Sequence, residues 1–394
     1  MARIAVICAF LPNRNTGMYT VDLSAYAYFQ NAYPNDEIAY YALGPLEKLG
    51  YTPAETHQQY LPLQDHVDAV READLIVFWG DFLHSKPYWE VDLSKWLVRD
   101  GICADHTAAI ELIYRAFMLE DASDAVLGKV VVYGGTIITI GAGDLRDARY
   151  NAALRRLITR AGGIHFRDAL SQMKSSPLRG NRSVLGSDCA LQLSRDDFTR
   201  YGVVDAFPEQ PGEKMGVFFG RAKWIAQPLA LSRALAAQTG RKAQWIPWVD
   251  SAPRQLPLAR LFGYPARRLP PLPRELLASL LECRFVLTDT YHLCVNAWNL
   301  GIPAVCLGYG SQHVAHTLGD KKKEILFAQY GASPYYLYRE HIANPVSIPA
   351  TAKHIARLVE QDDMARIVTA TIHEQAAAAR ARLAESCDSV LGRT

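Results

Sequence analysis

The sequence predicts an α/β protein with two Rossmann-like domains that face a cleft, followed by C-terminal helices. Three observations predict this architecture. Strands and helices alternate along the chain, a polar stretch divides the alternation into two series, and the last residues have a helical pattern. The length of 394 residues agrees, because one hydrophobic core rarely covers so long a chain. The expected domains are residues 1–205, 206–348 and 349–394.

The first series of elements reads as a parallel sheet with covering helices. Short apolar runs predict strands at Ile4–Ala9, Asp74–Gly80 and Lys129–Gly135, because strands of a parallel sheet are buried on both faces. Residue spacing predicts the remaining elements: a polar loop at Asn13–Gly17, helices at Val21–Phe29, Leu63–Ala73 and Leu145–Ala161, and strands at Glu37–Leu43 and Ile164–Arg167. Such strand–helix–strand units form right-handed crossovers within one sheet.

The polar stretch Ser194–Lys214 carries two prolines and two glycines, so it is the predicted linker. A second alternation of strands and helices follows it. Its expected elements are strands at Gly216–Phe219 and Ala243–Val249, a helix at Pro228–Gln238, and terminal helices at Ala352–Glu360 and Ile367–Ala384.

The segment Phe285–Leu307 predicts a strand, a short helix and a second strand. Asp289 is the expected N-cap of the helix Thr290–Leu300, and Gly301 with Pro303 supplies a stop. The first helical turn then lies at the carboxyl end of a parallel strand, where α/β proteins bind ligands. Its amides attract anions, and a neutral His292 there could act as a base, although a structural histidine in a capped helix would show the same pattern.

Two other predicted strands end in glycine. Gly80-Asp81 opens a loop that contains His84, Tyr88 and Trp89, a set that suits the hydroxyls and apolar faces of a sugar. The same aromatic residues could equally well close the edge of the sheet. Gly134-Gly135 ends the next strand, but no dinucleotide fingerprint follows it.

Four motifs in order resemble the polysaccharide pyruvyl transferase family. They are FRDALS with LGSDCALQL, then GVFFGR, then TDTYHLCVNAWNLGIPAVCLG, and finally GDKKKEILFAQYG, which together span Phe166–Gly331. The resemblance implies a GT-B-like fold and transfer of a pyruvyl group from phosphoenolpyruvate onto a sugar or glycan. It also implies roles in exopolysaccharide or cell-envelope glycan biosynthesis.

The resemblance further implies roles for individual residues. His292 is the expected catalytic acid or base. The expected donor-binding residues are Arg167, Arg221, Thr290, Tyr291, Lys321 and Lys322, and the expected acceptor-binding residues are Asp81, His84, Tyr88 and Trp89. No organic cofactor is implied, because phosphoenolpyruvate is a substrate, and no metal is demanded.

The chain departs from the family at Thr290, where the family commonly has an arginine two residues before the histidine. A hydroxyl cannot replace a guanidinium fork against an acidic donor group. The departure therefore leaves two alternatives open: a GT-B glycosyltransferase that uses a nucleotide sugar, and a non-catalytic sugar-binding protein of the same fold.

The composition limits which kinds of binding partner the sequence indicates. Forty-two basic and 40 acidic residues give a net charge of +2, which does not indicate a nucleic-acid partner. The seven cysteines include no Cys-x-x-Cys pair, and His313 and His316 lack the further ligands of a metal site. With no predicted membrane span or signal peptide, we expect a cytoplasmic protein that makes at most peripheral membrane contact with a lipid-linked acceptor.

Overall fold

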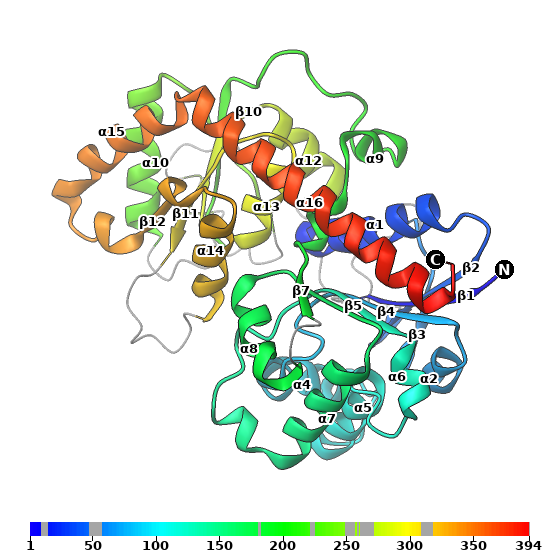
Figure 1. Cartoon of the computed structure of the whole chain (residues 1–394). Coiled ribbons are helices and arrows are strands. Elements are labelled where there is room, and N and C mark those ends of the chain that lie inside the picture. Colours follow the sequence, from blue (N-terminus) through cyan, green and yellow to red (C-terminus); the bar gives the residue numbers. More distant parts are fainter. Residues whose placement is uncertain are drawn as a thin grey trace. The chain divides into compact units, whose positions relative to one another are not determined.

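The structure is a computed structural model, shown in Figure 1. It describes residues 1–8, 15–46, 57–179, 183–220, 225–248, 257, 260, 272–308 and 318–393. The chain separates into two compact units. The first comprises Met1–Pro12, Val21–Gln192 and Gln375–Thr394, and the second comprises Asn13–Thr20 and Leu193–Glu374. The helical residues after 348 are thus divided between the two units.

The first unit contains a seven-stranded sheet in the order β3-β2-β1-β4-β5-β6-β7, with every neighbouring pair parallel. The predicted parallel sheet is therefore confirmed. Its strands are β1 (Arg3–Cys8), β2 (Glu37–Ala42), β3 (Tyr60–Pro62), β4 (Leu75–Asp81), β5 (Val130–Gly135), β6 (Gly163–Phe166) and β7 (Ser183–Leu185).

Helices cover both faces of this sheet (Figure 1). Trp79 of β4 donates through its indole Nε1 to the carbonyl of Val21 in α1, whereas the neighbouring Phe78 packs edge-on against Phe117 of α5. Because successive strand residues point to opposite faces, α1 and α5 lie on opposite sides. The helices are α1 (Thr16–Ala32), α2 (Leu63–Arg71), α3 (Lys86–Tyr88), α4 (Ser94–Arg99), α5 (His106–Phe117), α6 (Asp124–Gly128), α7 (Ala148–Arg160) and α8 (Ala169–Arg179).

The start of α1 corrects one prediction. Gly17, expected in a polar loop, lies in the first turn of α1. Asn15 accounts for the earlier start, because its side-chain oxygen accepts a hydrogen bond from the amide of Gly17 and its carbonyl accepts from Met18 and Tyr19.

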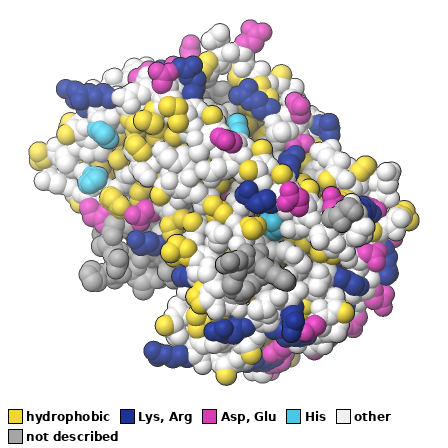
Figure 2. Space-filling view, in the orientation of Figure 1, with side chains coloured by type: hydrophobic (Ala, Val, Ile, Leu, Met, Phe, Trp, Pro, Cys, Tyr) yellow, Lys and Arg dark blue, Asp and Glu magenta, His cyan; other side chains and the backbone are white. Residues whose placement is uncertain are grey.

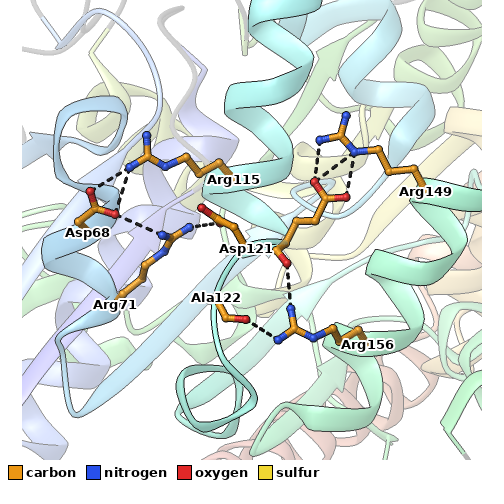
Figure 3. A network of polar contacts seen from close by, with 8 residues as sticks. Asp68, Arg71, Arg115, Asp121, Ala122, Arg149 and Arg156 are labelled. Carbon is orange, nitrogen blue, oxygen red and sulfur yellow. Dashed lines mark hydrogen bonds and ion pairs between the residues drawn. The ribbon is translucent and has the colours of Figure 1, made fainter.

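A network of ion pairs joins helices on the α5 side of the first unit (Figure 3). Arg71 and Arg115 share Asp68, with Arg115 Nη2 2.9 Å from Asp68 Oδ2, and Arg149 pairs with Glu120 at 2.6 Å. Each pair has at least one side chain that is 40% or more exposed, so each stabilises the fold only slightly.

The second unit contains a five-stranded parallel sheet in the order β12-β11-β10-β8-β9. Its strands are β8 (Lys214–Phe218), β9 (Ala243–Trp245), β10 (Cys283–Thr288), β11 (Ala304–Gly308) and β12 (Tyr336–Tyr338). The helices are α9 (Arg195–Arg200), α10 (Ala226–Thr239), α12 (Pro273–Leu281), α13 (Tyr291–Asn299), α14 (Leu318–Gln329), α15 (Ile348–Val359) and α16 (Asp362–Leu391), of which α16 continues into the first unit.

The expected linker holds the short helix α9. Ser194 and Asp197 form a reciprocal capping box at its start, so local side-chain hydrogen bonds produce a helix that the polar composition concealed. Charges of both signs are interspersed on the face shown in Figure 2, in keeping with the net charge of +2. Among the described residues, no helix has the length and apolar character needed to cross a bilayer.

Candidate functional site

The predicted strand–helix–strand segment is present in the second unit. Strand β10 ends at Thr288, α13 begins at Tyr291, and every side chain of α13 is buried. The helix ends before Gly301, whose φ of 79° is the left-handed conformation that favours glycine. The segment therefore places Thr290, Tyr291 and His292 at the carboxyl edge of the sheet.

The expected role of Asp289 as helix N-cap is wrong. The N-cap position is Thr290, and no side chain caps the helix there. Asp289 Oδ1 instead accepts hydrogen bonds from the amide of Gly220 at 2.8 Å and from Thr290 Oγ1 at 3.2 Å. Asp289 thus ties Gly220, two residues beyond the end of β8, to the start of α13.

Two lysines of α14 lie at the same place. Lys323, which is 2% exposed, donates through Nζ to the carbonyl of Asp289 at 2.9 Å. Lys322 is 7% exposed, and its Nζ lies 4.6 Å from the centroid of the Tyr291 ring, a cation–π contact. Both ammonium groups therefore lie beside the first turn of α13.

Lys321 lies differently, although it was expected to bind the donor. Its side chain is 45% exposed and pairs with Glu324 in the next turn at 3.3 Å. Lys323, which was not among the expected donor-binding residues, is the one that is buried against Asp289. A run of three lysines cannot distinguish these positions, because the outcome depends on which side of α14 packs against β11.

His292 is 8% exposed and packs edge-on against the Tyr291 ring, with centroids 5.1 Å apart. Its backbone carbonyl accepts a hydrogen bond from Asn296 Nδ2 at 2.8 Å. Gly17, in the part of α1 that belongs to the same unit, lies directly against this histidine: a Cβ built on Gly17 would be 2.2 Å from the His292 Cβ. A glycine is therefore required where α1 begins.

Arg221, His313 and His316 lie outside the described residues. Gly220, which precedes Arg221, is described. A Cβ built on it would be 3.2 Å from Thr290 Oγ1. Gly220 itself thus lies next to the start of α13.

Arg167 lies in the first unit. Its Nη2 is 3.1 Å from Asp81 Oδ1 and its Nη1 is 3.5 Å from Asp188 Oδ2, with the arginine and Asp188 almost fully buried. The Phe82 ring lies 5.3 Å from the guanidinium carbon. The structure thus pairs a residue expected to bind the donor with Asp81, one expected to bind the acceptor. Both roles stay predictions.

The backbone at this edge is strained. Asp81 has a φ of 43°, which is uncommon for a residue other than glycine, and it follows Gly80 at 91°. Strained backbone of this kind concentrates at functional sites. On the adjacent strand, Gly134 has a φ of 70°, and a Cβ there would be 2.2 Å from Cys189 Sγ.

Two of the other expected acceptor residues, Trp89 and His84, are buried. Trp89 is fully buried, and its Nε1 donates to the carbonyl of Leu83. His84 is buried edge-on against Phe78, and burial lowers its pKa to about 4, so it is neutral at pH 7. Both side chains pack in the core, a geometry that offers no support for contact with a sugar.

Tyr88 and Asp81 border a small pocket. Its other lining residues include Cys8, Phe82 and Phe117, and its volume is about 10 Å³, roughly the space of one water molecule. Burial also raises the pKa of Tyr88, so its hydroxyl stays protonated at neutral pH. This pocket is too small to hold a sugar.

Comparison with known families decides the classification. The family described as polysaccharide pyruvyl transferase matches residues 23–311. The chain belongs to the polysaccharide pyruvyl transferase family. The predictions of this family and of a transferase are therefore confirmed. No curated protein matches the chain.

Solved structures show the fold. UDP-GlcNAc 2-epimerase from Neisseria meningitidis, bound to UDP-GlcNAc, is 13% identical and matches 98% of this chain and 99% of that one, with a TM-score of 0.55. The S. aureus MnaA–UDP structure is 11% identical and matches 100% of this chain and 98% of that one, with a TM-score of 0.58. These are GT-B fold enzymes, so the predicted GT-B-like fold class is confirmed.

Proposed function

We propose that this pyruvyl transferase family member moves the pyruvyl group of phosphoenolpyruvate onto two hydroxyls of a sugar or glycan. Family membership supports this reaction, and the observation that carries it is the convergence of His292, Lys322 and Lys323 at one strand end. Phosphoenolpyruvate carries a carboxylate and a phosphate, which two ammonium groups and the start of a helix can hold.

The chemistry requires one proton donor and two hydroxyl nucleophiles. The methylene carbon of the donor gains a proton, the first hydroxyl oxygen bonds to the neighbouring carbon, and the bond from that carbon to the phosphate oxygen breaks. The second hydroxyl then closes the ketal, and inorganic phosphate leaves with the remaining proton. His292 is the proposed acid or base, because an imidazole can exchange protons near neutral pH.

The two lysines can supply the positive charge that is missing at Thr290. Thr290 is neutral and hydrogen-bonds Asp289, so it cannot supply the charge of the family's arginine. Lys322 and Lys323 place two cations within the same region. The proposed reaction needs no organic cofactor and no metal. We place it in the cytoplasm, on a precursor of a cell-envelope glycan.

A thermal-shift comparison tests the donor. Phosphoenolpyruvate should raise the melting temperature, because a ligand that binds the native state stabilises it. Release of inorganic phosphate in the presence of an acceptor, followed by ³¹P NMR, then tests turnover. A protein that phosphoenolpyruvate does not stabilise contradicts this proposal.

Thr290 favours one competing function, a glycosyltransferase that takes a nucleotide sugar. The diphosphate of such a donor could lie at the start of α13 without an arginine. The structurally similar proteins named above were solved with UDP-GlcNAc and with UDP. Stabilisation by a UDP-sugar, and not by phosphoenolpyruvate, would favour this function.

A further inference from the structure

A buried carboxyl group lies on α1 of the first unit. Asp22 is 8% exposed, and its Oδ2 accepts a hydrogen bond from the Tyr60 hydroxyl at 2.6 Å. Its Oδ1 is also buried and has no hydrogen-bond partner among the residues that the structure describes. Burying a polar oxygen without a partner is costly, so an unpartnered oxygen of this kind indicates that another group satisfies it.

Gln58 fixes the geometry around this carboxyl. Its Nε2 donates to the backbone carbonyl of Asp22 at 2.9 Å and to the Tyr60 hydroxyl at 2.9 Å. The Tyr60 hydroxyl therefore accepts from the amide and donates to the carboxyl. Because Tyr60 occupies Oδ2, Oδ1 is the carboxyl oxygen left for a further partner.

Aromatic rings lie beside the carboxyl. Tyr26 is four residues after Asp22, so the two side chains lie on one side of α1. The Tyr26 ring is stacked on the ring of His57, with centroids 5.6 Å apart, and lies 6.0 Å from the Tyr40 ring. His57 is exposed, and Tyr26 and Tyr60 are partly exposed, so this cluster reaches the surface.

The cluster lies near the carboxyl edge of the sheet. Cys8 ends β1, and burial together with the nearby Asp22 charge raises the pKa of its thiol. The carboxyl edge of a parallel sheet is where α/β proteins bind ligands. A carboxyl, an amide and aromatic rings at this edge form the combination that recognises the hydroxyls and apolar face of a sugar.

We propose that Asp22, Gln58 and Tyr60 form the acceptor site, in which Asp22 Oδ1 binds a sugar hydroxyl and the Tyr26 and His57 rings flank the sugar. The identification of this sugar as the acceptor rests on the proposed function. Asp81, the residue first expected in this role, is paired with Arg167 and borders a pocket of one-water size. Burial also raises the pKa of Asp22 to about 7, so at neutral pH the group can accept or donate a hydrogen bond.

A purely structural role for Asp22 and a sugar-binding role predict different results for the variant Asp22→Asn. If Asp22 serves to clamp residues 57–60 to α1, Asp22→Asn should lower the melting temperature and leave sugar binding to the folded protein intact. If Asp22 binds the acceptor, the isosteric Asn should leave the melting temperature at pH 7 unchanged or raised, and should weaken sugar binding.

Saturation-transfer NMR on the full chain, without donor, tests the proposal. The probes are methyl glycosides of galactose, mannose and N-acetylglucosamine. We expect at least one glycoside to bind the wild type, and its dissociation constant to rise 10-fold or more in Asp22→Asn and in Tyr60→Phe. Asp65→Asn, an exposed carboxylate of α2, is the matched control and should bind normally.

Two outcomes overturn the proposal: unchanged glycoside binding in both Asp22→Asn and Tyr60→Phe, or no glycoside binding to the wild type. Tyr60→Phe keeps the test valid where Asp22→Asn does not fold. Phosphoenolpyruvate thermal shifts on the same preparations separate this site from the donor. Failure of phosphoenolpyruvate to stabilise the wild type, with Asp22-dependent glycoside binding retained, removes the proposed donor and leaves the sugar site standing.

Discussion

The two sheet edges carry opposite charge arrangements. At the end of β10, Lys322 contacts an aromatic ring and Lys323 a backbone carbonyl, with Asp289 as the nearby carboxylate. At the end of β4 and β6, Arg167 lies between the carboxylates of Asp81 and Asp188. The first edge has an excess of cations and the second an excess of carboxylates. The first therefore suits an anionic donor, and the second does not.

The largest expected effect is on His292, at the cationic edge. His292→Ala should lower turnover by roughly 100- to 10,000-fold, the usual cost of losing a positioned acid or base. The melting temperature should change little. Turnover and melting are measured on one preparation, with the exposed His106→Ala as the matched control. A folded His292→Ala protein that turns over at a near-normal rate removes this residue from the mechanism.

Arg167 probes the other edge. Arg167→Ala leaves two carboxylates without the guanidinium between them, and breaking a buried ion pair in this way costs about 3–5 kcal/mol. We therefore expect a large fall in the free energy of unfolding, measured by chemical denaturation. If Arg167→Ala keeps its stability and loses phosphoenolpyruvate binding, the arginine belongs with the donor, as the family resemblance implied, and the contrast between the two edges fails.

The pH dependence of stability tests Asp22. Burial raises its pKa from 3.8 to about 7, so between these values the folded protein holds a proton that the unfolded chain releases. Raising the pH from 4 to 7 therefore lowers the free energy of unfolding. Above pH 7 the carboxyl is ionised in both the folded and the unfolded chain, so the loss of stability no longer grows. Its upper limit is roughly 4 kcal/mol, from the size of the shift.

Asp22→Asn removes this titration. We compare the free energy of unfolding of the variant with that of the wild type. The difference should be near zero at pH 4, should favour the variant at pH 7, and should change little between pH 7 and pH 8. Denaturation at these three pH values measures the difference, and Asp65→Asn should show none of this trend. A difference that does not vary with pH would show that Asp22 stays ionised in the folded protein.

The lysines sharpen the assignment of the cationic edge. Lys322→Met keeps much of the apolar stem and removes the ammonium group beside Tyr291. Loss of a charged hydrogen bond to the donor should weaken phosphoenolpyruvate binding by about 1.5–3 kcal/mol, measured by calorimetry. Lys321→Met, on the exposed neighbour paired with Glu324, should bind normally. Equal weakening in both variants would indicate that α14 acts through its overall charge.

The sequence correctly predicted the elements that have a clear local pattern of apolar residues. The runs RIAVIC, DLIVFWG and KVVVYGG read as strands because both faces of a parallel sheet exclude polar residues, and all three are strands. The helix α9 escaped prediction because a capping box, and not apolar spacing, forms it. Trp89 shows the limit for sites: an aromatic residue on a predicted loop reads the same whether it meets a ligand or the core.

Contacts between residues far apart in the chain could not be predicted from the sequence. Glycine at position 17 indicated a loop, whereas its packing against His292 depends on where α13 lies beside the first residues of α1. The same holds for Asp22, whose partners Gln58 and Tyr60 come from a different segment of the chain. Each of these residues is ordinary in its local sequence and acquires its role from the residues that folding brings beside it.

Gly17 yields the smallest expected effect on stability. In Gly17→Ala the new Cβ overlaps His292, so one of the two must move, and overpacking of this kind costs about 1–3 kcal/mol. Because the new Cβ meets the His292 side chain, we expect this side chain to shift, and turnover should fall more than the loss of folded protein explains. Gly128→Ala is the matched control, since nothing lies within 4 Å of a Cβ there. Normal turnover per folded molecule in Gly17→Ala would mean that the position of His292 does not control the reaction, and the cationic edge would lose its catalytic group.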